Sequence, residues 1–175
     1  MITVVTPTIP GREHLLAECE ASVKAAGFPH LVGLDADREG PAAVRNRLLE
    51  RVRTPWTLFL DDDDLVHPAY WRVVERNLVG ADVVYTAWEL QGAGDPQPKP
   101  GPFDAELLAR QNFIPVTACV RTSALRAVGG FPLDAALEDH ELWKALSAAG
   151  YRFRYVPVVA WTYRRFPGSR TDLAA

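Results

Sequence analysis

Four consecutive aspartates, Asp61 to Asp64, stand at the end of an apolar run that begins at Trp56. Adjacent carboxylates repel one another, and removing them from water is costly unless an opposite charge lies nearby. Carboxylates at the end of a buried strand therefore indicate a hard divalent cation, held by oxygen ligands and shared with a phosphate-bearing substrate. The alternative is a solvated acidic turn in which one aspartate caps the helix expected from Tyr70.

The segments around the acidic run alternate between strand-like and helix-like patterns. Strands are expected at residues 2–6, 31–34, 56–60, 81–86, 116–120 and 153–163, and helices at 15–26, 41–52, 70–78, 122–128 and 138–149. This alternation implies right-handed βαβ units and a mainly parallel central sheet flanked by helices. The chain is therefore expected to be an α/β protein with a single domain over residues 1–175.

Residues 91–102 interrupt this alternation with four prolines and three glycines. Such a composition predicts a mobile surface loop. The loop would either cover the acceptor side of a site or be a tolerated insertion.

Composition excludes several classes of protein. The formal net charge of −3 provides no general basic field for nucleic acid. Cys19 and Cys119 are isolated in apolar segments, which predicts buried reduced thiols rather than a disulfide framework. No basic segment precedes an apolar block at the start, and no apolar run approaches the ~20 residues that span a bilayer. We expect a cytoplasmic protein whose membrane contact, if any, is peripheral.

In an open α/β sheet, ligands bind at the carboxyl ends of the strands. Three polar groups fall at such ends: Pro7-Thr8 after the first strand, Asp35 and Asp37 after the second, and the acidic run after the third. Their convergence favours a metal and phosphate site over an accidental acidic turn.

Five groups of short motifs follow one another along the chain. They are Val4-Val5-Thr6-Pro7-Thr8 with Arg12, Gly40-Pro41-Ala42-Ala43-Val44-Arg45-Asn46, Leu60-Asp61-Asp62-Asp63-Asp64 with Pro68, Val128-Gly129-Gly130-Phe131-Pro132 with Glu138-Asp139-His140-Glu141-Leu142-Trp143, and Tyr163-Arg164 with Gly168-Ser169-Arg170-Thr171. In this order and spacing they resemble the family 2 glycosyltransferases, inverting enzymes of the GT-A fold that use nucleotide-sugar donors. The resemblance extends over residues 2–171.

The resemblance implies one in-line displacement, in which an acceptor hydroxyl attacks the anomeric carbon while a nucleoside diphosphate leaves. Such a reaction needs a general base and a cation. By the resemblance Asp139 is the base, with Glu138 as an orienting or structural partner. The structural alternative is that the helix dipole alone favours an acid in a first turn, and that dipole would also lower the pKa of Asp139.

The implied cofactor is Mn²⁺ or Mg²⁺. Asp63 is the expected direct ligand, and Asp61 would contact the donor ribose or reach the metal through water. Asp62 is assigned to the nucleotide-sugar site, although either Asp62 or Asp64 could instead cap the helix that follows Pro68.

The resemblance also implies a donor pocket. Its members would be Thr6, Pro7, Thr8, Arg12, Asp35, Arg45, Arg164 and Ser169. Asp35 would bond the nucleotide base, with the three residues of the first strand end lining its pocket. The arginines and Ser169 would contact the diphosphate or ribose. The structural alternatives are a strand-end turn for Asp35 and solvated charges for the arginines.

The tail departs from the family pattern. Many relatives carry a histidine there that completes the metal site, whereas this chain has Arg164-Arg165-Phe166. The site would then use water, bind metal weakly or rely on arginine. The Gln-x-x-Arg-Trp signature of processive synthases is absent, so transfer of a single sugar is expected.

UDP-sugars are the commonest donors in the family. The acceptor stays open between a glycan, a lipid, a protein, a metabolite and a modified base, and so does the oligomeric state. Two other functions remain. A sugar nucleotidyltransferase would need a glycine-rich loop after the first strand, where this chain has only Gly11. A non-catalytic nucleotide-binding or glycan-binding module would explain the missing histidine.

Overall fold

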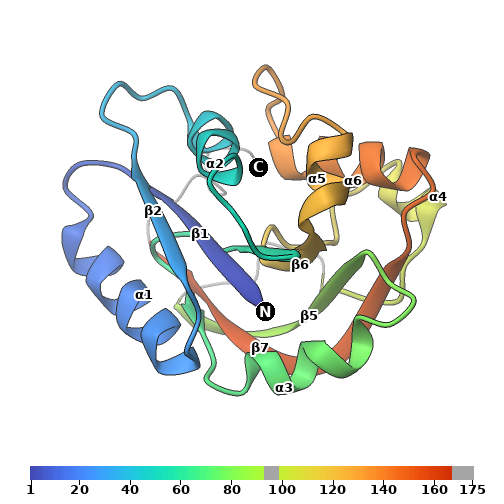
Figure 1. The fold of residues 1–175 in the computed structure, drawn as a ribbon, viewed down its shortest axis with the longest axis horizontal. Coiled ribbons are helices and arrows are strands. Elements are labelled where there is room, and N and C mark those ends of the chain that lie inside the picture. Colours follow the sequence, from blue (N-terminus) through green and yellow to red (C-terminus); the bar gives the residue numbers. More distant parts are fainter. Residues whose placement is uncertain (93–98, 167–175) are drawn as a thin grey trace.

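The computed structural model describes residues 1–92 and 99–166. Within these residues, seven strands form one sheet in the order β2-β1-β3-β6-β5-β7-β4. Figure 1 shows that the sheet is curved. The strands are β1 (Ile2–Thr8), β2 (His30–Leu34), β3 (Trp56–Phe59), β4 (Leu65–Val66), β5 (Val83–Gly92), β6 (Ala118–Arg121) and β7 (Phe153–Arg165). The helices are α1 (Glu13–Ala26), α2 (Pro41–Leu49), α3 (Tyr70–Val74) with a 3-10 turn at Glu75–Asn77, α4 (Ala105–Leu108), α5 (Thr122–Ala127) and α6 (Glu138–Ala148).

Most paired residues of the sheet lie in parallel pairs. β1 runs parallel to β2 and β3, and β5 runs parallel to β7. β6 joins the two groups through antiparallel pairs with β3 and β5, and the short β4 pairs antiparallel with β7. The expected α/β fold class is therefore confirmed.

The expected elements appear with shifted ends. β1 continues through Thr8, so Pro7 belongs to the strand, and β5 continues to Gly92 into the predicted loop of residues 91–102. Residues 93–98 of that loop lie outside the described residues. The sequence did not predict β4 or α4, because two and four residues are too short to show a hydrophobic period.

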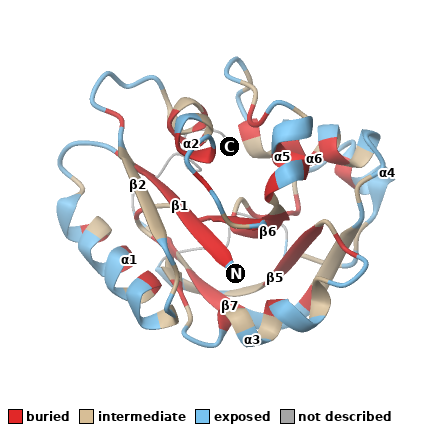
Figure 2. Cartoon of the chain, viewed as in Figure 1, coloured by how far each residue is buried: buried red, intermediate tan, exposed pale blue. Residues whose placement is uncertain are grey.

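Alternation along the strands produces one core on each face of the sheet. Val4 and Leu58 pack with α1 and α3, while Val5 and Phe59 pack with α2, α5 and α6. Figure 2 shows buried strands between helices whose outer faces are exposed. Both cysteines are buried free thiols, as predicted. No helix of the described residues has the length and apolarity that a membrane crossing requires.

Two motifs that lie far apart in the sequence meet where α2 packs against the turn after α5. The side chain of Asn46 donates to the carbonyl of Phe131 at 2.8 Å and accepts from its backbone N–H at 2.8 Å. A Cβ atom at Gly130, where φ is +77°, would lie 2.4 Å from Oδ1 of Asn46. The Gly-Gly-Phe turn therefore needs glycine at this position for steric as well as conformational reasons.

Replacing Gly130 with alanine should lower the free energy of unfolding more than the same change at Gly129. Both glycines have positive φ, so both variants carry the left-handed penalty of about 1–2 kcal/mol, but a Cβ at Gly129 meets no atom within 4 Å. We expect Gly130→Ala to cost at least about 1 kcal/mol more, since it also displaces the Asn46 side chain. Urea titration of both variants measures the difference, and equal losses would show that the Asn46 contact is unimportant.

Candidate active site

The acidic run leaves the carboxyl end of β3 and turns directly into β4. Asp62 and Asp64 are buried, at 5% and 2% exposure. The N-cap of α3 is Ala69, and no side chain caps that helix. The interpretation of the run as a solvated turn with a capping aspartate is therefore wrong. Its carboxylates instead interact with three arginines from distant parts of the chain.

Arg45 connects the acidic run to α6. Its guanidinium donates to Oδ1 of Asp61 at 2.5 Å and to Oε1 of Glu138 at 2.9 Å. Its Cζ also lies 5.2 Å from the ring centre of Phe131. Burial opposes the charge of Arg45, but Asp61 and Glu138 outweigh burial and raise its pKa. Arg45 is only 2% exposed, so the alternative of a solvated helix charge is wrong.

Arg12 and Thr8 hold the second aspartate of the run. Arg12 donates through Nε and Nη2 to the carboxylate of Asp62, with the shortest distance 2.7 Å, and through Nη2 to Oδ2 of Asp63 at 2.6 Å. The hydroxyl of Thr8 donates to Oδ2 of Asp62 at 2.6 Å. Asp62 thus ties the end of β1 to the end of β3.

Arg164, near the end of β7, contacts the acidic run. Its backbone N–H donates to Oδ1 of Asp64 at 2.9 Å, and its guanidinium donates to the carbonyl of Asp63 and pairs with Glu18. Nη2 of Arg164 is buried with no hydrogen-bond partner among the described residues. Phe166 follows, with its ring centre 5.8 Å from the guanidinium carbon of Arg164. Ser169, the other predicted tail residue, lies outside the described residues.

Three carboxylates of the run remain grouped together. Ligand atoms of Asp61, Asp63 and Asp64 all lie within 4.8 Å of one another. Burial and the neighbouring aspartates raise the pKa of Asp64 well above its ordinary value, and the pKa of Asp63 is raised for the same reasons. Such a donor set fits a hard divalent cation, whose charge would offset the repulsion.

Asp139 lies in the first turn of α6, one residue beyond the partner of Arg45. Its Oδ1 accepts the backbone N–H of His140 at 2.8 Å, and its Oδ2 accepts Nδ2 of Asn112 at 2.9 Å. Burial raises the pKa of Asp139 despite these bonds and the nearby Arg45. The expectation that the helix end would lower this pKa is therefore wrong, because burial outweighs it.

The remaining predicted donor residues are engaged within the protein. Pro7 and Thr6 are buried, and the Thr6 hydroxyl is 2.8 Å from Nε2 of His30, whose pKa burial lowers to about 4. Asp35 accepts the backbone N–H groups of Glu39 and Gly40, each at 2.8 Å. Asp35 thus shapes the turn that leads into α2.

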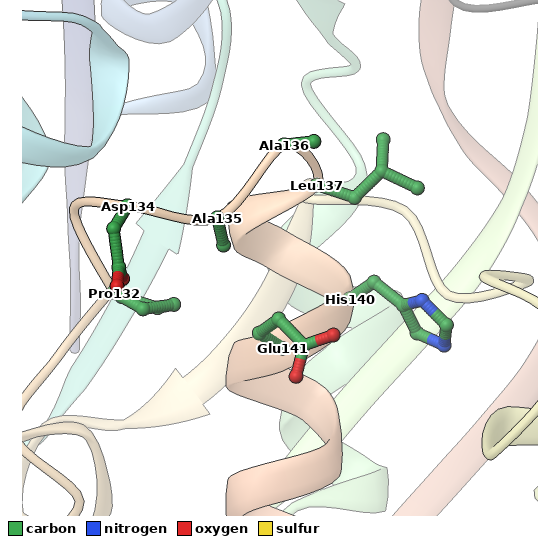
Figure 3. Close-up of a pocket in the computed structure, with 7 residues that line it drawn as sticks. All are labelled: Pro132, Asp134, Ala135, Ala136, Leu137, His140 and Glu141. Atoms are coloured by element: carbon green, nitrogen blue, oxygen red, sulfur yellow. The ribbon is translucent and has the colours of Figure 1, made fainter.

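A hollow of about 490 Å³ lies beside the N-terminus of α6 (Figure 3). Its lining comes from Pro132, Asp134, Ala135, Ala136, Leu137, His140 and Glu141. None of the predicted site residues lines it. His140 also joins α6 to α4, because its Nε2 lies 2.5 Å from the carbonyl oxygen of Leu108.

Sequence reasoning missed Asn112 and Glu18. Asn112 lies in the irregular segment between α4 and β6, where no period or motif singles it out. Glu18 is one of several acids on α1, and only the fold brings it to Arg164.

Residues 14–128 match the family model for glycosyl transferase family 2. The match covers more than half of the chain, so the chain belongs to this family of glycosyltransferases. The resemblance read from the motifs is thereby confirmed. No curated protein matches the sequence significantly.

Solved structures share the fold at low sequence identity. S. aureus TarS 1–349 matches with a TM-score of 0.71 and 17% identity, over 93% of this chain and 60% of that chain. The same protein with UDP-GlcNAc matches at 0.71 and 15%, over 99% and 61%. The mannosyltransferase PcManGT from Pyrobaculum calidifontis, with GDP-Man and Mn²⁺, matches at 0.72 and 14%, over 97% and 58%. The chain thus spans about three-fifths of the length of these proteins.

Replacing Arg45 with methionine should lower the free energy of unfolding by about 3–5 kcal/mol, because the buried ion pairs of Arg45 with Asp61 and Glu138 would both be broken. Arg47→Met on the same helix is the matched control. Arg47 pairs with Glu39 at the surface, and such exposed pairs contribute at most about 1 kcal/mol. Urea titration of both variants decides, and equal losses would contradict the bridging role of Arg45.

Proposed function

We propose that the chain is a metal-dependent inverting glycosyltransferase. It moves one sugar from a nucleotide-sugar, with UDP-sugars as the first candidates, to an acceptor hydroxyl by a single displacement. The observation that carries the proposal is the Arg45 bridge. It joins the acidic group that fits a cation to the helix turn that holds Asp139, a partly buried carboxylate suited to act as base.

The acidic run supports the donor and metal side of the proposal. Asp61, Asp63 and Asp64 would hold Mn²⁺ or Mg²⁺, which when bound would supply positive charge for the departing diphosphate. Arg164 has a buried N–H group without a partner among the described residues, which suits a contact to a phosphate oxygen. Arg12 is one-third exposed and could extend this positive surface.

Asp139 would act on the acceptor side. Its carboxylate removes the proton of the acceptor hydroxyl as that oxygen bonds to the anomeric carbon. The bond from this carbon to the diphosphate oxygen breaks, and its electron pair leaves with the nucleotide. Burial raises the pKa of Asp139 toward the operating pH, which makes the carboxylate a better proton acceptor.

The neighbours with bound ligands support the choice of donor class. TarS is seen with UDP-GlcNAc, and PcManGT with GDP-Man and Mn²⁺. Nucleotide-sugars of uridine and guanosine are therefore the first donors to test. Thr6, Pro7 and Asp35 stay proposed as parts of the base pocket, with Thr6 and Pro7 at the end of β1 and Asp35 acting through the turn that it shapes.

Replacing Asp139 with asparagine should reduce transfer by about 10²–10⁴-fold, the usual contribution of a general base. Binding of the nucleotide-sugar should be unchanged, because the amide keeps the shape of the carboxylate. Glu141→Gln, an exposed change on the same helix, is the control. Nucleotide release from a donor and acceptor panel is the measurement, and full activity of Asp139→Asn would refute the assignment of the base.

Replacing Asp63 with asparagine should weaken Mn²⁺ binding in the presence of UDP by at least about tenfold, since even residues that only orient metal ligands cost that much when replaced. Calorimetric titration of Mn²⁺ into the protein with UDP measures the change. Asp134→Asn, at an exposed loop position, is the control. Unchanged Mn²⁺ affinity in Asp63→Asn would remove Asp63 from the metal site.

If no nucleotide binds the intact protein under any condition, the non-catalytic module becomes the better account.

A further inference from the structure

The side chain of Asn112, which belongs to none of the sequence motifs, contacts the proposed base Asp139. Asn112 lies between α4 and β6, and its Nδ2 is 2.9 Å from Oδ2 of Asp139. The other carboxylate oxygen of Asp139 accepts the backbone N–H of His140. Among the described residues, each oxygen of the carboxylate thus accepts one hydrogen bond, and the bond from Asn112 is the one donated by a side chain.

The chemistry of the pair fixes the orientation of the amide. An ionised carboxylate only accepts hydrogen bonds, so the NH₂ group of Asn112 must face Asp139. Its carbonyl oxygen then points elsewhere, and it is buried with no partner among the described residues. An unpartnered buried acceptor is unfavourable. Asn112 is therefore a poor choice for stability alone, and its contact with Asp139 is what the asparagine provides.

We propose that Asn112 is a positioning residue that orients the carboxylate of Asp139 and keeps it ionised for proton transfer. The inference rests on the proposed function, since it requires Asp139 to be the base. Asn112 would act through Asp139 and need not touch the substrate itself.

The charges around Asp139 come from several elements. Burial and Glu138 on α6 disfavour its ionised form, while Arg45 on α2 favours it. The ring of His140 is directed to the carbonyl of Leu108 on α4. Asn112 adds a hydrogen bond to the charged form, which lowers the pKa of Asp139. Its removal should raise that pKa and move the acid limb of activity, where the base becomes protonated, to higher pH.

The experiment compares Asn112→Ala, Asn112→Asp and the control Asn77→Ala with the unmodified protein. The side-chain amide of Asn77 also donates one hydrogen bond, 2.8 Å long, to the carbonyl of Val73. Its replacement therefore loses an amide hydrogen bond elsewhere in the protein. The pKa of Asp139 is followed by carboxyl ¹³C NMR, and the acid limb by the pH profile of transfer. We expect Asn112→Ala to raise the pKa of Asp139 and the midpoint of the acid limb by about one pH unit. This is the scale of one hydrogen bond to a charged group.

Asn112→Asp should raise the pKa further, because it keeps the shape of asparagine but brings a like charge toward Asp139. This variant also tests the inference if Asn112→Ala does not fold. Asn77→Ala should leave both readouts unchanged.

The inference is overturned if both Asn112 variants titrate like the unmodified protein and lose only thermal stability. Failure of the proposed function has a different signature, namely full transfer activity in Asp139→Asn. The NMR titration needs no activity, so it judges the Asn112 contact in either case.

Discussion

The structure of the site depends on one buried cation between two acids. Arg45 is only 2% exposed, and it lies between Asp61 after β3 and Glu138 at the start of α6. A guanidinium in such surroundings requires its acidic partners. The bridge therefore fixes how the acidic run and the turn that carries Asp139 are placed. Asn46, the next residue on α2, fixes the backbone of Phe131, and the Arg45 guanidinium lies over the ring of the same residue.

The four aspartates of the acidic run fall into two groups, because Arg12 binds the carboxylate of Asp62. Arg12 and Thr8 satisfy Asp62, which then serves to join β1 to the run. Asp61, Asp63 and Asp64 keep ligand atoms close together, and burial with mutual repulsion raises the pKa values of the last two. This excess of negative charge is what a divalent cation would neutralise. The four adjacent aspartates thus have unequal roles, which depend on where each lies after β3 and on which arginine it contacts.

Sequence reasoning succeeded where a pattern repeats and failed where a contact is made by folding. The hydrophobic periods predicted the α/β class and the main strands and helices, but not the two residues of β4. The motifs predicted that Asp61 and Asp139 belong to one site. They could not predict that Arg45 pairs with both Asp61 and Glu138, because Arg45 lies 93 residues from Glu138 in the sequence. Asn112 had no signal at all, because a single loop asparagine carries no period.

The most direct test of this account is a crystal structure with Mn²⁺ and UDP, measured at a wavelength where manganese scatters anomalously. The account predicts one anomalous peak at the carboxylates of Asp61, Asp63 and Asp64, with the diphosphate beside it and Arg45 still joining Asp61 to Glu138. A bound nucleotide whose manganese peak lies away from these three carboxylates, or whose binding breaks the Arg45 bridge, would contradict it.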